Sequence, residues 1–140
     1  MKKRIFISFD YDNDKHYRYL LSAFSKNSRF DIEFIDVTPD EIQSYSIDRI
    51  KAVLTGKIKD ATHTLVVTGE YANSYHRDSR EIGARNWQWW EINKSHEEGK
   101  GLIGIKIKST NDWPTPLLGK GAALAHSFEV DAIINAIDKA

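Results

Sequence analysis

The sequence contains no cysteine, only three prolines and a single methionine among its 140 residues. Without cysteine, the chain has neither a disulfide framework nor a thiolate metal site. Its 20 basic and 20 acidic residues give a formal net charge of zero. This balance supplies no electrostatic reason to bind nucleic acid or an anionic membrane, so we expect neither as a partner.

Long apolar runs are also missing. The N-terminal stretch 1–9 begins basic and becomes apolar, but Asp10 follows it, which makes it too short for the apolar core of a signal peptide. No segment approaches the roughly 20 apolar residues of a membrane-spanning helix. The length suits one domain with one core. We therefore expect a single cytoplasmic domain over residues 1–140.

Short apolar segments alternate with amphipathic ones along the chain. Strand-like patterns occupy 4–9, 30–37, 62–68, 102–107 and 123–128. Helical spacing follows in a segment capped by Asp12 or Asn13, in 46–59, in a tryptophan-rich segment that ends near Glu98, and in 129–139. This order predicts an α/β fold with a flavodoxin-like, doubly wound, five-stranded parallel sheet. We expect the strand order 2-1-3-4-5, with helices on both faces.

In such a sheet, ligands bind outside the carboxyl ends of the strands, beside the first strand. The loop 9–14, the loop 69–78 and the start of the tryptophan-rich helix should therefore lie on one rim. The first loop contains no glycine, and the chain has neither a Walker P-loop nor a GxGxxG motif, so a pyrophosphate cradle is not expected there.

Metal and hydrolase motifs are incomplete. Asp10, Asp12 and Asp14 imitate the start of a calcium loop, but the glycine and the terminal glutamate are missing. The five histidines are scattered without ligand spacing, and no GxSxG elbow occurs. A response-regulator receiver is disfavoured as well, because the third strand does not end in aspartate. We expect no metal and no resident cofactor.

The most unusual stretch reads NWQWWEI and holds three of the chain's four tryptophans. On a helix, Trp87 and Glu91 are four residues apart and share a face, whereas Trp89 and Ile92 lie on another. We expect Trp89 and Ile92 to pack against the sheet, since large aromatic side chains contribute strongly to burial. Trp87 and Glu91 then turn away from the packed side and are candidates for chemistry. A surface salt bridge is the alternative role for Glu91.

Two motifs resemble those of TIR domains. The segment 4–9, RIFISF, resembles the F-I-S-Y/F opening of TIR domains, and Trp87-x-x-x-Glu91 resembles the Trp-x-x-x-Glu signature of TIR NADases. The segment 99–105, GKGLIGI, makes the chain especially similar to the bacterial TIR-like branch of the Thoeris antiphage systems, the ThsB type. The resemblance spans about residues 3–108.

This resemblance implies cleavage of the nicotinamide–ribose bond of NAD, which is then a substrate and not a cofactor. The bond is N-glycosidic, and its breakage passes through an oxocarbenium-like transition state. Nicotinamide leaves as a neutral group, so one carboxylate suffices to hold the ribose hydroxyls and stabilise the positive charge. That carboxylate is the catalytic Glu91. The expected substrate-binding residues are Ser8, Phe9, Asp10, Tyr11, Arg49, Arg77 and Trp87.

Among these, we expect Phe9, Tyr11 or Trp87 to stack on a ring of the nucleotide, and Arg49 or Arg77 to face its pyrophosphate. The resemblance also implies self-association into a dimer or a higher assembly. A cyclic ADP-ribose isomer would act as a signal to a separate effector protein, whereas attack by water would give linear ADP-ribose.

The chain departs from the TIR pattern at Arg85, where TIR domains often carry serine, and over 76–84, which looks long. We therefore expect a remodelled loop before the tryptophan-rich helix. Three other functions stay open: a TIR-like scaffold that only assembles with partners, a nucleotide-binding module without chemistry, and an enzyme like the nucleoside 2-deoxyribosyltransferases. The last share a related fold and a glutamate that acts on an N-glycosidic bond.

Overall fold

In the computed structural model, the described residues are 3–25, 32–35 and 46–140. All five strands belong to one sheet: β1 (Lys3–Ser8), β2 (Ile32–Ile35), β3 (His63–Thr68), β4 (Gly101–Lys106) and β5 (Ala123–Ala125). They lie in the order β2-β1-β3-β4-β5, and every adjacent pair is parallel. The predicted doubly wound, flavodoxin-like sheet is confirmed.

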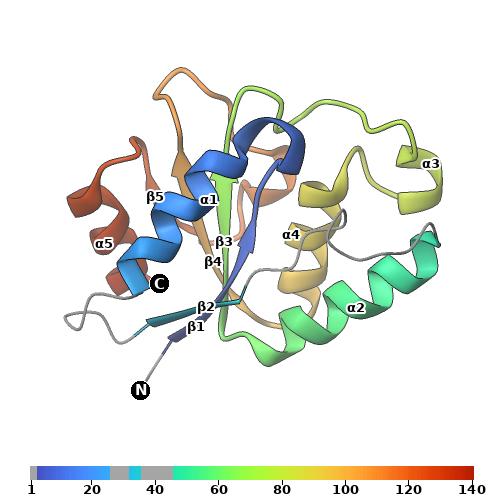
Figure 1. The fold of residues 1–140 in the computed structure, drawn as a ribbon, viewed down its shortest axis with the longest axis horizontal. Coiled ribbons are helices and arrows are strands. Elements are labelled where there is room, and N and C mark those ends of the chain that lie inside the picture. Colours follow the sequence, from blue (N-terminus) through green and yellow to red (C-terminus); the bar gives the residue numbers. More distant parts are fainter. Residues whose placement is uncertain (1–2, 26–31, 36–45) are drawn as a thin grey trace.

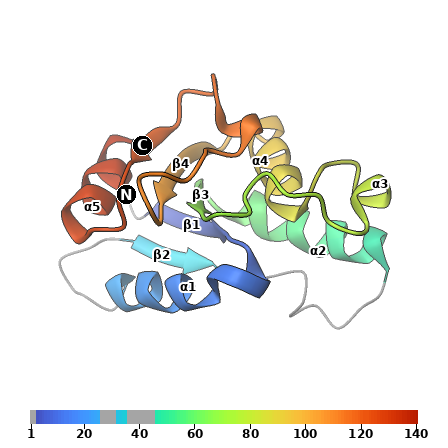
Figure 2. The ribbon, with the colours of Figure 1, turned by 90° about the horizontal axis from the view of Figure 1, so that it is seen from above.

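Helices cover both faces of this sheet (Figure 1). They are α1 (Tyr11–Ser25), α2 (Ile47–Asp60), α3 (Ser79–Ile82), α4 (Trp87–Glu97) and α5 (Val130–Lys139), with a 3₁₀ turn, η2, at Thr115–Leu117. Figure 2 shows α1 and α5 on one face and α2 and α4 on the other. Among the described helices, none has the length and apolar character needed to cross a membrane.

The alternation of side chains along β1 decides what each face receives. Ile5 and Ile7 join the core under α1 and α5, whereas Phe6 packs against the α2 side. Ser8 follows Phe6 by two residues and therefore points to the same side as Phe6. A fully buried hydroxyl thus stands at the carboxyl end of β1, opposite α4.

Most of the predicted elements recur with ends shifted by a residue or two, whereas the fifth strand, expected at 123–128, ends at Ala125. The helix expected at 46–59 is α2, and Ser46 is its N-cap, accepting the backbone N–H of Arg49 at 3.3 Å. The second strand was expected at 30–37. Its described part is β2, and the rest of that range lies outside the described residues.

The prediction for the start of α1 is wrong. The helix begins at Tyr11, and its cap is Asp10 instead of Asp12 or Asn13. The Asp10 Oδ1 accepts the backbone N–H of Asp12 at 3.1 Å, and its Oδ2 accepts the Asn13 side-chain N–H at 2.7 Å. The sequence misleads here because aspartate and asparagine stand at several consecutive positions and each is a good cap. Most of the expected loop 9–14 is therefore the first turn of a helix.

The helix α4 faces the sheet with Ile92, as predicted, but also with Glu91, for which the prediction is wrong. Its buried side chains are Gln88, Glu91, Ile92 and Ser95. These positions form the i, i+3, i+4, i+7 stripe that a helix lays on a sheet, so Glu91 lies on the packed side beside Ile92. Glu91 retains only 3% of its surface exposed, which rules out a surface salt bridge as its role here.

The tryptophans that pack against the core also differ from the predicted one. Trp89 was expected in the core, but it is only half-buried and faces the loop after β3. Trp87 and Trp90 meet edge to face, with ring centroids 5.9 Å apart, and pack against the apolar cluster under α2. Position 89 lies about 200° around the helix from position 91, which turns Trp89 away from the sheet.

Candidate active site

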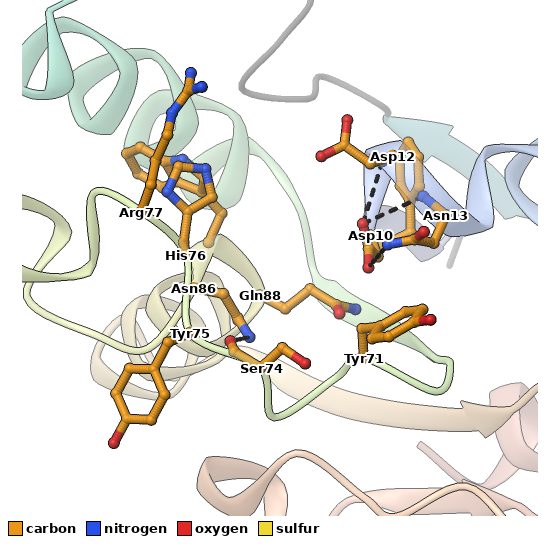
Figure 3. A pocket seen from close by; sticks show the side chains of 12 residues that line it. Asp10, Asp12, Asn13, Tyr71, Ser74, Tyr75, His76, Arg77, Asn86 and Gln88 are labelled. Atoms are coloured by element: carbon orange, nitrogen blue, oxygen red, sulfur yellow. Dashed lines mark hydrogen bonds between the residues drawn. The ribbon is translucent and has the colours of Figure 1, made fainter.

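A cavity of about 470 Å³ opens at the carboxyl ends of β1 and β3, and we call it the rim pocket (Figure 3). Its walls come from the segment after β1, the loop after β3 and the first turn of α4. The lining residues are Phe9, Asp10, Asp12, Asn13, Tyr71, Ser74, Tyr75, His76, Arg77, Asn86, Trp87 and Gln88. This is the edge at which doubly wound sheets bind ligands, and the volume suits a small molecule.

The two sides of the rim pocket carry opposite charge. Asp10 and Asp12, at the start of α1, face His76 and Arg77 across the cavity (Figure 3). Arg77 is well exposed and lies 3.8 Å from the Asp78 carboxylate. The pocket therefore offers an acidic wall to a cationic group and a basic wall to an anionic one.

Asp14 connects the first turn of α1 to the loop after β3, behind the acidic wall. It is 7% exposed, and burial, followed by the charges of Asp10 and Glu70, raises its pKa to about 6. Its carboxyl packs on Gly69, where a Cβ would collide with it. Glycine at this position therefore lets the first turn of α1 rest directly on the backbone that follows β3.

The basic wall is tied to α4 by Asn86 and Trp89. The Asn86 Oδ1 caps α4 by accepting the backbone N–H of Trp89 at 2.9 Å, and its Nδ2 donates to the carbonyls of Ala72 at 3.0 Å and Ser74 at 2.9 Å. The Trp89 indole N–H donates to the Ala72 carbonyl at 3.1 Å. The segment 76–84, for which we expected a remodelled loop, contains the short helix α3 and continues this wall.

Glu91 lies beneath the floor of the rim pocket and is not among its lining residues. Its Oε1 accepts a hydrogen bond from the Ser8 Oγ at 2.7 Å. Burial raises the pKa of Glu91 to about 8, and the Ser8 hydrogen bond opposes that shift. The carboxyl is therefore mostly protonated at neutral pH in this conformation. Such a perturbed acid beside a cleft is a typical candidate for a functional group.

Sequence reasoning missed Gln88, which lines the rim pocket. Its Nε2 donates to the Ser8 carbonyl at 3.2 Å and to the Val67 carbonyl at 2.9 Å, so it bridges β1 and β3. Gln88 precedes Glu91 by three residues, which places both on one helix face. That spacing was the available signal, and the neighbouring tryptophans obscured it.

The expected substrate-binding residues occupy different places. Those that line the rim pocket are Phe9, Asp10, Arg77 and Trp87. Ser8 lies beneath the floor with Glu91, and Arg49 is exposed on α2 and does not line the pocket. Tyr11 begins α1, but its side chain lies outside what the structure describes. The roles assigned to these residues stay predictions.

Replacing Ser8 is expected to move the titration of Glu91. Ser8→Ala removes the O–H that favours the carboxylate, so the pKa of Glu91 should rise further. A hydrogen bond to a charged group contributes about 1.5–3 kcal/mol, which corresponds to an upward shift of about one pKa unit or more. An NMR titration of the Glu91 carboxyl carbon measures the shift.

Ser95→Ala is the matched control for this titration. The Ser95 Oγ donates to the backbone carbonyl of Glu91 at 2.7 Å and not to its carboxyl, so this variant should leave the pKa close to the wild-type value. Equal titrations of the Ser8→Ala variant and the wild type would show that Ser8 does not stabilise the carboxylate.

Comparison with known families identifies one match. The family described as "Thoeris protein ThsB, TIR-like domain" matches residues 6–112, which include residues 6–8 of β1 and the whole of α4. No match is found among curated proteins.

Solved structures with a similar fold include the 2-desoxiribosyltransferase from Leishmania mexicana, with a TM-score of 0.60, 12% identity, and coverage of 98% of this chain and 97% of that one. The 2-deoxyribosyltransferase from Bacillus psychrosaccharolyticus has a TM-score of 0.57, 12% identity, and coverage of 93% and 95%. A prokaryotic SEFIR domain has a TM-score of 0.58, 15% identity, and coverage of 99% and 95%. At these identities, the likeness shows the fold alone.

Proposed function

The chain belongs to the TIR-like domain family of the Thoeris protein ThsB, and on this premise we propose that it cleaves the nicotinamide–ribose bond of NAD. The observation that carries the proposal is the environment of Glu91. This acid is buried at the ligand-binding edge of the sheet, beneath a pocket of suitable size, and its pKa is raised to about 8. Acidic side chains whose pKa is raised in this way are concentrated at catalytic sites.

The proposed reaction breaks the bond between the ribose C1′ and the pyridine nitrogen. The electron pair leaves with nicotinamide, which becomes neutral and needs no general acid, and positive charge develops on the ribose. The Glu91 carboxylate stabilises that charge in a site of low dielectric, where the attraction is stronger than in water. The acidic wall at Asp10 and Asp12 suits the cationic nicotinamide ring, and the wall at His76 and Arg77 suits the pyrophosphate.

Access to Glu91 requires the pocket floor to open, and Trp87 is the side chain that moves in this proposal. Trp87 lies one helical turn above Glu91, and its indole N–H forms no hydrogen bond to the described part of the chain. Gln88, by contrast, is held at two points. Once the indole turns aside, solvent and substrate reach the carboxyl, its pKa falls, and the ring becomes free to stack on the substrate.

The ribosyl cation has two fates. Attack by water, which then loses a proton, gives linear ADP-ribose, whereas attack by an atom of the same molecule gives a cyclic isomer. We propose the cyclic product, which would signal to a separate effector protein in antiphage defence. We also propose self-association at the outer wall, which carries the exposed Tyr71 and Tyr75, because a second copy there would exclude water and favour the cyclic product.

The purified chain is expected to release nicotinamide from NAD, more efficiently per molecule as its concentration rises and copies assemble. Chromatography with mass detection should show equal loss of NAD and gain of nicotinamide. A cyclic product has the mass of ADP-ribose less one water. Absence of nicotinamide from protein shown to be assembled would contradict the proposal and favour a scaffold or a binding module.

A nucleoside 2-deoxyribosyltransferase-like activity is the second candidate. The observation that favours it is the small share of cationic side chains around the pocket, since Arg77 and His76 stand against Asp10 and Asp12. A neutral nucleoside needs no partner for a pyrophosphate. Base exchange between deoxynucleosides, assayed beside NAD cleavage with the same protein, distinguishes the two activities.

A further inference from the structure

Gln88 combines deep burial with a place on the wall of the rim pocket. Only 4% of its surface is exposed, yet it lines the cavity. Its Nε2 donates to the carbonyls of Ser8 at 3.2 Å and Val67 at 2.9 Å, which end two adjacent parallel strands. In Figure 3 the side chain extends across the pocket between the acidic wall and Asn86.

The chemistry of these two partners settles which way the amide points. Both are main-chain carbonyl oxygens, which only accept hydrogen bonds, so the NH₂ end must face them. A flipped amide would set Oε1 against two oxygens and lose both bonds. The Gln88 NH₂ group therefore faces the carbonyls of Ser8 and Val67, and its Oε1 points away from the two strands.

The Oε1 is left with unused accepting capacity. No donor in the described part of the chain bonds to it, and it is not among the buried atoms that lack a partner, so it remains accessible from the cavity. Asn86 is the side-chain amide at the N-terminus of α4, and it also lines the pocket. Its oxygen caps α4, and its NH₂ donates to two loop carbonyls, so neither end is available to a ligand. Gln88 thus offers a ligand an amide oxygen that can accept a hydrogen bond, which Asn86 does not.

We propose that Gln88 determines specificity at this site by accepting, at Oε1, a hydrogen bond from an N–H or O–H group of the ligand. For NAD, that donor is either the carboxamide N–H of nicotinamide or a hydroxyl of the adjoining ribose. The inference rests on the proposed function only in this choice of ligand. The contact lies beside Glu91, so it would hold the reacting sugar or base over the catalytic carboxyl.

A fixed acceptor discriminates well because it does not have to be ordered when the ligand binds. A ligand without the donor covers this oxygen and leaves it unpaired, which weakens binding by about tenfold or more. The anchoring through Ser8 and Val67 also keeps Oε1 from rotating to accommodate another group.

Two ligand pairs, each differing in one donor, test the proposal by calorimetry. NAD is compared with its 3-acetylpyridine analogue, which keeps the carbonyl but lacks the carboxamide N–H, and with an analogue that lacks the 2-hydroxyl of the nicotinamide ribose. The wild type should prefer NAD by about tenfold or more in one pair, and that pair identifies the donor. Gln88→Met, of similar length but without the amide, should lose the preference.

Asn93→Met is the matched control, because Asn93 is an exposed amide on the same helix, away from the pocket. It should keep the wild-type preference. If Gln88→Met fails to fold, the Gln88 carbonyl carbon of the wild type replaces it as the probe. Its NMR signal should respond to NAD but not to the analogue without the donor.

A preference that persists in Gln88→Met, or an unresponsive carbonyl signal, overturns the proposal. If NAD is neither bound nor cleaved, the proposed function fails, and a third pair decides the inference alone. This pair is thymidine and 3-N-methylthymidine, which lacks the base N–H. Equal binding, or no binding, within every pair overturns the role of Gln88.

Discussion

Glu91→Gln is expected to abolish NAD cleavage while leaving the nucleotide bound. The substitution keeps the size of the side chain and an oxygen that accepts from Ser8, but it removes the negative charge that the reaction requires. Loss of one preorganised electrostatic contact typically lowers kcat by about 10²–10³-fold. Nicotinamide release measures kcat, and calorimetry measures the dissociation constant of NAD.

Glu97→Gln makes the same chemical change on the same helix at an exposed position. Glu97 lies 3.6 Å from Lys94 on the surface, and this contact contributes little. The control should therefore turn over NAD like the wild type. Turnover by Glu91→Gln at the wild-type rate would remove Glu91 from the chemistry and leave the family motif without a catalytic role in this chain.

The same Glu91→Gln variant is expected to be more stable than the wild type at alkaline pH. Burial raises the pKa of Glu91 from 4.5 to about 8 in the folded state. Between these values the folded state binds more protons than the unfolded state, so the free energy of unfolding of the wild type falls as the pH rises. Above about pH 8 the loss is complete, whereas below 4.5 the contribution of Glu91 is fully present.

The glutamine does not titrate, so the stability difference between the two proteins should grow with pH. A shift of this size corresponds to a few kcal/mol, on the order of the effect of a disruptive core substitution. Urea unfolding of both proteins at pH 5 and at pH 9 measures the difference. Asp14 and His63, whose pKa values burial raises and lowers respectively, titrate in both proteins and cancel in the comparison.

Parallel stability curves across this range would show that Glu91 is not buried as a neutral acid in solution. If the stability difference rises with pH and the variant loses turnover, Glu91 lowers the stability of the folded protein at alkaline pH and is also required for activity. Such a trade-off is common at functional sites.

Much of the fold was predictable because it depends on local patterns. Apolar strands such as 62–68 alternate with amphipathic helices such as 46–59, and this order leaves few topologies other than a parallel, doubly wound sheet. The topology in turn places the segments after β1 and β3 on one rim. Four of the expected binding residues line the pocket there for that reason.

Tertiary packing overrode the local pattern at α4. Helical periodicity shows which residues share a face, but not which face the sheet covers. Because tryptophan is abundant in this helix, we predicted that Trp89 packs against the sheet. The buried side chains of α4 instead include Gln88, Glu91 and Ser95. Polar partners on the strands, above all Ser8, make this burial tolerable.

The sequence by itself determined the order of the strands, the family and the pairing of the β1 motif with Glu91, because each is encoded in residue spacing. Only the tertiary structure decided that Glu91 is a buried acid beneath the pocket and that Gln88 points an anchored amide into it. Burial, pKa and amide orientation depend on atoms about 80 residues away in the chain, and no local pattern records them.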